Sequence, residues 1–359
     1  MTAPAREFHR LGSVVLIGGG DLMLHAARAF GQRLPCFAIL APRHAEEALP
    51  LDGRSTRQAF TDAGIRSVVV ADMDRDPSWR SLVAERDSTL ALCFGPAWIF
   101  SAEVRQAFGL GMLNFNGIPV PHYLGGAHYS WQILNDDRSG GCILQDITGD
   151  LDRGDILRAE HFQLPPSVTV PLDYFHANHE RGVVFIDQLV ADLLSGVSFV
   201  PRPLSELDSR RLYFPRLLTS ENAFIDWSWG AGDVVRFCHA FDRPYAGAGT
   251  FLGERLLRLR DVSLAEDRVT LHPFTAGLVV RRHDNAAYVA ARGGVLRFGI
   301  VVDGKSGSSC LGDLREGMRL HTGAERLEQA RLFRPKLGGA TSLPDTARSA
   351  DQPTNRRGP

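Results

Sequence analysis

The sequence has little of what would direct a protein to a membrane, to an oxidising compartment or to a polyanion. No apolar run among its 359 residues reaches the roughly 20 that span a bilayer, and the opening MTAPAREFHR has no apolar signal segment. The formal net charge is only −1, so no global field attracts nucleic acid or acidic lipid. The five cysteines are widely spaced and form no CxxC pair, as is typical of reduced thiols. We therefore expect a cytoplasmic protein.

The sequence also has few metal-binding patterns. His122 and His128 stand six residues apart without a neighbouring cysteine or an HExxH pair, which disfavours zinc. The acidic segment DITGDLDRGDI (146–156) departs from the ligand spacing of calcium loops. Acidic residues beside glycines are more often turn formers. No metal site is predicted.

The first half of the chain contains short β-branched runs with helix-like stretches between them. The runs are SVVLIGG (13–19), CFAILA (36–41), RSVVVAD (66–72) and STLALCFG (88–95). This alternation predicts an α/β domain with a mostly parallel sheet covered on both faces. A further strand in GCILQDI (141–147) and a helix over 178–196 complete a domain predicted to span 10–205. Cys36 and Cys93 lie in the apolar runs and are predicted to be core residues.

The second half of the chain has a different pattern of apolar residues. FIDWSWGAGDVVRFCHAF predicts a turn and one amphipathic helix, with Val234, Val235, Phe237, Cys238 and Phe241 on its apolar side. Short strand-like runs follow in GERLLRLRDVSL, RVTLHPF, GLVVRRH, AAYVAAR and GVLRFGIVVD. They predict a small β-barrel-like domain over 210–335. The polar, aperiodic residues 338–359 are expected to form a disordered tail.

The glycines of GGGD (18–21) follow a predicted strand and precede a predicted helix. They only partly match the dinucleotide-binding pattern, because Met23 stands at the position of its third glycine. A tight strand-to-helix turn is the preferred interpretation, with anion binding at the helix N-terminus as the alternative.

Three loops follow strands whose carboxyl ends should meet at one edge of the sheet. They are FGPAWIF (94–100), the loop that begins at Asn114 and Asn116, and DITGDLDRGDI (146–156). Ligands of open parallel sheets bind at that edge. The sequence therefore predicts a ligand site between these three loops.

The same loops carry a family resemblance. The order N-x-N, GG, W and LDRGDIL resembles the formyltransferase family that uses 10-formyltetrahydrofolate, which includes methionyl-tRNA formyltransferase and the amino-sugar N-formyltransferases. Residues 225–248 are similar to the start of the C-terminal domain of methionyl-tRNA formyltransferase. The resemblance covers residues 13 to 335. It implies a Rossmann-like catalytic domain followed by a small β-barrel-like (OB-like) domain.

The resemblance also implies roles for individual residues. Asn114 and Asp152 match the family's catalytic asparagine and aspartate, whereas Asn116 stands where the family has its catalytic histidine. A reduced folate is implied as the cofactor. The residues implied to hold its pterin ring are Phe94, Gly95, Pro96, Trp98, Ile99, Asp146 and Ile147.

The asparagine at position 116 leaves three interpretations open, because an amide donates hydrogen bonds but does not titrate. In formyl transfer, another group such as His122 or His128 would take over the histidine's role. Alternatively, the protein is an inactive folate- or amine-binding homologue. In the third interpretation the donor is 5-formiminotetrahydrofolate. Its formimino group is basic and already cationic near neutral pH, so its transfer to an amine needs no histidinium.

The acceptor is predicted to be a small primary amine, in specialised (antibiotic-type) metabolism. A transfer-RNA acceptor would call for a basic segment after the second strand. In APRHAEEALPLDGR (41–54) acidic residues match basic ones. Methionyl-tRNA formyltransferase remains the alternative. His122, Tyr123 and His128 are the candidates for lining the acceptor pocket.

Overall fold

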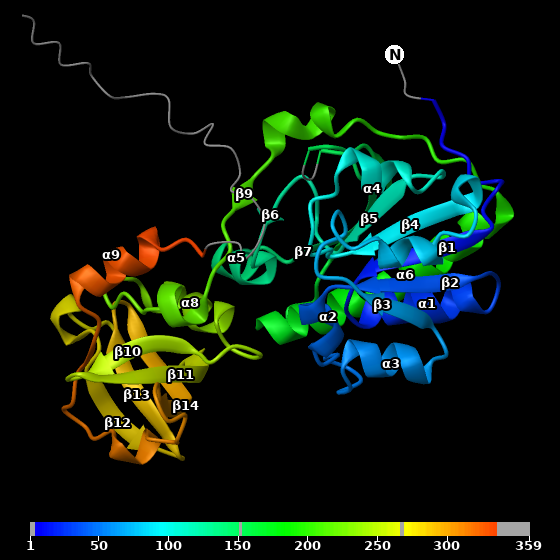
Figure 1. Cartoon of the computed structure of the whole chain (residues 1–359). Coiled ribbons are helices and arrows are strands. Elements are labelled where there is room, and N and C mark those ends of the chain that lie inside the picture. Colours follow the sequence, from blue (N-terminus) through cyan, green and yellow to red (C-terminus); the bar gives the residue numbers. More distant parts are fainter. Residues whose placement is uncertain (1–3, 151–152, 266–268, 336–359) are drawn as a thin grey trace, which may run out of the picture.

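The computed structural model describes residues 4–150, 153–265 and 269–335, so Asp152 and the tail 338–359 lie outside the described residues. The chain forms an α/β domain followed by a smaller β-rich domain (Figure 1). The Rossmann-like α/β domain and the small β-rich C-terminal domain agree with the fold class predicted from the sequence.

The first domain is built on a seven-stranded sheet in the order β3-β2-β1-β4-β5-β7-β8. Five strands are parallel: β1 Ser13–Gly18, β2 Cys36–Leu40, β3 Arg66–Val69, β4 Thr89–Phe94 and β5 Met112–Asn116. β7 Ser139–Asp146 and β8 Ile156–Gln163 run antiparallel at one edge. All residues of β1 and β4 are buried, which explains their uninterrupted apolar runs.

Helices cover both faces of this sheet. On one face, α1 Asp21–Gly31 and α6 Pro171–Ser195 pack Phe30 and Phe185 into the core, together with α2 Pro42–Glu46 and α3 Thr56–Asp62. On the other face, Trp79 of the 3-10 helix Pro77–Leu82 and Val104 of α4 Ala102–Gln106 pack against the strands.

Two elements of this domain differ from the sequence-based expectation. α6 begins at Pro171, seven residues before the predicted start, and Asp173 caps it by accepting hydrogen bonds from the N–H groups of Thr169 and Val170. β8 was not predicted. Its polar and apolar residues mix because it is an edge strand, where Arg158 pairs with Asp192 at 2.7 Å.

The glycine-rich start forms the expected strand-to-helix turn. Gly18 has φ +132°, and a Cβ there would lie 2.0 Å from the Phe94 carbonyl oxygen. Gly19 N–H donates to the same oxygen at 3.2 Å. Only glycine allows β1 and β4 to approach so closely where they end.

The second domain is a six-stranded antiparallel sheet in the order β12-β13-β14-β11-β10-β15. Its strands are β10 Ala248–Leu252, β11 Arg255–Leu264, β12 Val279–His283, β13 Ala286–Ala291, β14 Gly294–Asp303 and β15 Leu320–His321. Helix α8 Ala231–Ala240 packs on the sheet through Val234, Phe237 and Cys238. Short helices α7 Thr219–Asn222 and α9 Ala324–Leu332 flank it.

The prediction of a strand in RVTLHPF is wrong for the described part of that segment. Residues 269–272 are irregular, and Pro273–Thr275 forms a 3-10 helix. Pro273 has no N–H for a sheet ladder, and His272 Nδ1 accepts the Phe274 N–H at 3.2 Å, which favours the turn. The sequence reading also missed β10 and β15.

The two domains share one hydrophobic cluster. Ile133 of α5 (His128–Leu134) and Tyr174 of α6 pack with Val234 and Phe241 of the second domain. Ser130 Oγ donates to the Ala240 carbonyl oxygen at 2.7 Å across this contact. A linker with a 3-10 helix at Leu204–Arg210 connects the domains, and its short strand β9 Tyr213–Phe214 pairs with β6 Leu124–Gly125 of the first domain.

The cysteines are all buried and unpaired, and Cys36 and Cys93 lie in the cores as predicted. Among the described residues, no helix combines the length and apolar content that crossing a bilayer requires.

Candidate functional site

A cavity of about 270 Å³ lies at the carboxyl ends of β4 and β5. It is lined by Gly95, Pro96, Trp98, Ile99, Phe100, Asn114, Asn116, Gly125, Gln145, Asp146, Ile147, Thr148, Gly149 and Asp150. The three loops that the sequence singled out therefore border one cavity. The loops after β4 and β5 meet there as expected for parallel strands, whereas β7 is antiparallel, so its carboxyl end lies beside the start of β5, where Asp146 is opposite Leu113.

Three amide side chains lie on one face of the sheet at this cavity. Asn114 and Asn116 share a face because side chains alternate along β5, where Leu113 and Phe115 point into the core on the α6 side. Gln145 is the register partner of Asn114 in the antiparallel β5–β7 pair, so it shares that face. Asn114 is only 8% exposed and Gln145 only 3%.

The Asn114 amide oxygen is buried and has no hydrogen-bond partner among the described residues. Leaving a buried polar group unsatisfied costs about 1–3 kcal/mol. Such orphaned groups are rare in folded proteins and are often functional. The geometry is that of a group held ready for a ligand.

The loop after β4 forms the wall opposite the amides. Trp98 Nε1 donates to the Ala71 carbonyl oxygen at 2.9 Å, which ties the loop to the end of β3. Ile99 is 50% exposed and forms an apolar rim. Phe94, in contrast, is buried and packs against Phe115 in the core, so its side chain does not line the cavity. Phe94 ends the strand, and alternation turns its side chain inward.

The carboxylate of Asp146 lies on the opposite face from Gln145, because the two residues are adjacent in β7. Arg6 Nη1 pairs with Asp146 Oδ1 at 2.6 Å, and Arg6 Nη2 donates to the Leu110 carbonyl oxygen. Burial raises the pKa of Asp146, while the positive charge of Arg6 opposes that shift. The side chain thus ties the N-terminal segment to the end of β7, and Asp146 N–H donates to the Asp155 carbonyl oxygen.

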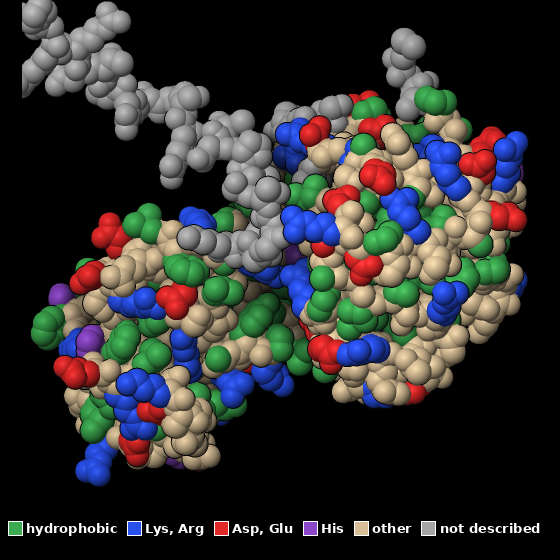
Figure 2. Space-filling model, in the orientation of Figure 1, with side chains coloured by type: hydrophobic (Ala, Val, Ile, Leu, Met, Phe, Trp, Pro, Cys, Tyr) green, Lys and Arg blue, Asp and Glu red, His purple; other side chains and the backbone are tan. Residues whose placement is uncertain are grey.

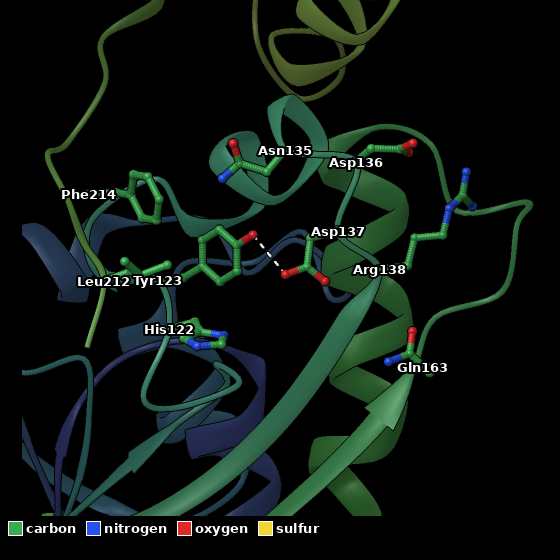
Figure 3. Close-up of a pocket in the computed structure, with 9 residues that line it drawn as sticks. All are labelled: His122, Tyr123, Asn135, Asp136, Asp137, Arg138, Gln163, Leu212 and Phe214. Atoms are coloured by element: carbon green, nitrogen blue, oxygen red, sulfur yellow. Dashed lines mark hydrogen bonds between the residues drawn. The ribbon is translucent and has the colours of Figure 1, made fainter. Parts of the chain in front are cut away.

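His122 and Tyr123 lie at a different hollow, of about 770 Å³ (Figure 3). It is lined by His122, Tyr123, Asn135, Asp136, Asp137, Arg138, Gln163, Leu212 and Phe214. The Tyr123 hydroxyl donates to Asp137 at 2.8 Å, and its ring stacks on Phe214 with centroids 5.3 Å apart. The structure therefore does not bring these two residues to the cavity that holds Asn116.

His128, the first residue of α5, lines neither space. Its ring packs edge-on against Tyr129 with centroids 4.1 Å apart, and burial lowers the pKa of His128 to about 4. His128 is therefore neutral near pH 7. The described lining of the cavity contains no histidine that could replace the imidazole at position 116.

Gln145 is one of the lining residues that were not predicted as site residues; the others are Phe100, Gly125, Thr148, Gly149 and Asp150. The signal for Gln145 was a polar residue at the end of the apolar run GCILQ, two positions after the buried Ile143 and therefore on the same face. No group of three His, Cys, Asp or Glu side chains arranged to hold a metal is found within residues 4–150, 153–265 and 269–335.

The chain is similar in sequence to known formyltransferases. Residues 217–308 match the family model "Formyl transferase, C-terminal domain". Methionyl-tRNA formyltransferase of Roseiflexus sp. (strain RS-1) is 28% identical over 277 residues, covering 76% of this chain and 81% of that protein. The Roseiflexus castenholzii enzyme is 27% identical over 273 residues, covering 76% and 83%.

Solved structures share the fold at low identity. The sugar 3N-formyltransferase WlaRD, solved in the presence of dTDP and 5-N-formyl-THF, matches with a TM-score of 0.60 and 13% identity, over 81% of this chain and 97% of that one. The N-formyltransferase of Helicobacter canadensis, in complex with folinic acid and dTDP-3-aminofucose, gives 0.58 and 11%, over 80% and 98%.

A Rossmann-like domain with this cavity, followed by a formyltransferase C-terminal domain, defines a one-carbon-group transferase. The family model over residues 217–308 and the methionyl-tRNA formyltransferase relatives support the resemblance to the folate-dependent formyltransferase family that the motif order predicted.

Proposed function

We propose that this enzyme transfers a formyl or formimidoyl unit from a reduced folate to the primary amine of a small molecule. The observation that carries the proposal is the Asn114 oxygen, which is buried and has no partner among the described residues, in a cavity between the two predicted pterin loops. Asp152, which lies outside the described residues, keeps its predicted role as the carboxylate that accepts the amine proton.

The cavity suits the pterin end of a folate. About 270 Å³ is slightly below the usual range for whole small-molecule ligands, so it suits a flat bicyclic ring while the rest of the folate extends outside. Trp98 and Ile99 contribute apolar side chains to its lining, and residues 146–150 also line it. Formyltransferases of this fold have been solved with 5-N-formyl-THF and with folinic acid, which supports a reduced folate here.

The bound folate would supply the one-carbon unit. The acceptor nitrogen bonds to that carbon, the carbon's bond to the folate nitrogen breaks, and the amine proton ends on the folate nitrogen. The Asn114 and Asn116 amides can donate to an oxygen that gains negative charge, and one preorganised donor is worth about 3–4 kcal/mol. Their oxygens can equally accept from a protonated imine. A neutral site with both capacities supports either unit.

The absence of an imidazole favours formimidoyl transfer. A formimino carbon is already electrophilic and its nitrogen cationic, so a histidinium beside it would repel it. Asn116 removes that charge, and neither His122 nor His128 lines the cavity. An inactive homologue is the less favoured interpretation, because a buried unpartnered Asn114 oxygen would then cost stability without benefit.

A small amine is favoured as the acceptor over transfer RNA. In the segment after β2, Arg54 pairs with Asp52 and Asp62, and Arg57 pairs with Glu46, so these arginines are held by neighbouring acids. Figure 2 shows Asp and Glu side chains interspersed with Lys and Arg on the visible face of both domains. Nucleic-acid binding relies on concentrated positive charge. The setting in specialised metabolism remains a prediction.

Methionyl-tRNA formyl transfer is the second candidate. Relatives with that name match 76% of this chain at up to 28% identity. It predicts uptake of label from 10-formyltetrahydrofolate into methionyl-tRNA.

The decisive experiment offers the purified protein both donors, 10-formyl- and 5-formiminotetrahydrofolate, with a panel of small amines and with methionyl-tRNA. Product mass separates the two units, since a formyl group adds one mass unit more than a formimidoyl group. We expect transfer to a small amine, with the formimino donor preferred. Absence of folate binding in calorimetry at millimolar ligand would overturn the proposal, with NAD as the control ligand.

A further inference from the structure

We propose that Gln145 is a specificity-determining residue. Together with Asn114, it would hydrogen-bond the transferred one-carbon unit and distinguish a formyl from a formimino group. This inference rests on the proposed function and extends it to a residue without an assigned role. Gln145 reaches the site from β7, which is antiparallel to β5 and 31 positions further along the chain than Asn114.

The position of Gln145 is set by the sheet. Asn114 and Gln145 are directly opposite in the ladder, so their Cβ atoms lie roughly 4.5–5.5 Å apart and their side chains leave the same face. Both line the cavity. Two amides at this spacing can contact both edges of a small planar group such as N–C=O or N–C=NH₂⁺.

The burial of Gln145 gives its amide a strong preference for a partner. Gln145 as a whole residue is only 3% exposed and lines the cavity, and the neighbouring Asn114 oxygen has no partner among the described residues. A polar side chain in a strand otherwise occupied by Cys142, Ile143 and Leu144 costs free energy unless a hydrogen bond forms. A ligand in the cavity supplies that bond.

An amide side chain can distinguish a formyl oxygen from a protonated formimino nitrogen. By rotating about its terminal torsion, Gln145 presents either an NH₂ donor to a formyl oxygen or a carbonyl acceptor to a protonated formimino nitrogen. A carboxylate at the same place offers only acceptors when ionised, and a thioether offers almost no hydrogen bonding. Replacing the amide at position 145 by a carboxylate should therefore alter the choice between donors, whereas the same change at a purely structural residue would affect both donors alike.

The test measures calorimetric dissociation constants and kcat/KM for both donors in wild type, Gln145→Glu and Gln145→Met. Gln145→Met nearly conserves volume, and we expect both donors to weaken by about tenfold, the value of one hydrogen bond. Gln145→Glu should raise the preference for the formimino donor over the formyl donor by about tenfold or more, because an ionised carboxylate attracts the cation and repels a carbonyl oxygen.

The pH dependence gives a second readout. Burial raises the pKa of an introduced glutamate, so in Gln145→Glu the affinity for the formyl donor should rise as pH falls and the carboxyl group becomes a donor. Affinity for the formimino donor should change in the opposite direction. Wild type, with a neutral amide, should lack this crossover.

The matched control makes the same two substitutions at Gln329, an exposed residue of α9 in the second domain, and should leave both donors unchanged. Near-UV circular dichroism and thermal unfolding identify variants that fail to fold, and binding is then compared only among folded ones. Equal donor preference in folded Gln145→Glu and wild type would overturn the role of Gln145. Failure of wild type to bind either folate would instead overturn the proposed function.

Discussion

Asn116 contributes a neutral amide to the cavity. A histidine at this position would titrate and give the cavity a pH-dependent charge. Asn116 lies on the same face of β5 as Asn114 and lines the same cavity, so a titrating side chain at this position would change the charge inside the proposed folate site. We therefore propose that substitution of Asn116 tests the role of charge in the site.

For Asn116→His we expect a loss of formimino transfer of about tenfold or more, because a partly charged imidazole opposes a cationic carbon. Some formyl transfer should appear, since a positioned acid contributes roughly 10²–10⁴ in rate. Steady-state rates with both donors check this, with Asp152→Asn expected to damage both reactions. If the variant gains formyl transfer and wild type shows no formimino activity to lose, the formyl interpretation is correct.

His128 carries a second prediction, on stability. Its pKa is lowered to about 4 in the folded state by burial, whereas the unfolded value is about 6.5. Between these values the unfolded chain binds a proton that the folded chain does not, so stability falls as pH decreases from about 6.5 towards 4. His128→Gln should flatten the free energy of unfolding against pH over that window, measured by urea titration. The exposed His176→Gln is the control, and parallel curves for wild type and His128→Gln would contradict the argument.

At the scale of elements, the pairing of β6 with β9 fixes the boundary between the cavity and the hollow of Figure 3. Gly125 of β6 lines the cavity, whereas Tyr123 and Phe214 on the same two segments line the hollow. Gly125 has φ +106°, and a Cβ there would lie 2.1 Å from the Phe214 carbonyl oxygen. Glycine is therefore required at position 125 for β9 of the linker to lie this close to β6.

Gly125→Ala should lower stability by about 1–3 kcal/mol and weaken folate binding, because the backbone strain and the clash displace β9. Gly53→Ala is the matched control. Gly53 also has a positive φ, +79°, but open space around its Cβ position, so it measures strain alone. Thermal unfolding and calorimetric titration with a folate check both variants. Equal effects at the two glycines would show that the close approach to Phe214 is unimportant.

At the scale of the whole molecule, the shared cluster between α5, α6 and α8 couples the two domains. Ile133 belongs to the first domain yet is 95% buried largely among second-domain side chains. The linker returns to the first domain through β9, which adds a second connection. We therefore expect the two domains to unfold together.

Ile133→Ala should cost about 2–5 kcal/mol and separate the single calorimetric transition into two. The space left by the shortened side chain at position 133 should weaken the contact between the domains more than it weakens the core of either domain. Val184→Ala, at a 43% exposed position of α6, should change stability by less than about 0.5 kcal/mol. Two transitions already present in the wild type would show that the shared cluster does not couple the domains.

The sequence by itself determined the elements that local patterns specify. β1, β2 and β4 follow from apolar runs that are buried in the sheet, and α8 follows from its helical period. The shared face of Asn114 and Asn116 was not predicted, because both were expected in a loop. The structure has them in β5, where strand alternation gives them one face. The meeting of the loops after β4 and β5 follows from the rule for parallel sheets, whereas the approach of the loop after the antiparallel β7 does not.

Only the tertiary structure decided contacts between distant residues. The antiparallel pairing of β7 sets Gln145 opposite Asn114, and Arg6 reaches Asp146 across 140 positions. The β6–β9 pair turns His122 and Tyr123 towards another hollow, although they follow Asn116 closely in sequence. Such contacts depend on strand order and packing, which the local hydrophobic period of one segment does not encode, because each is fixed by surfaces that only meet after folding.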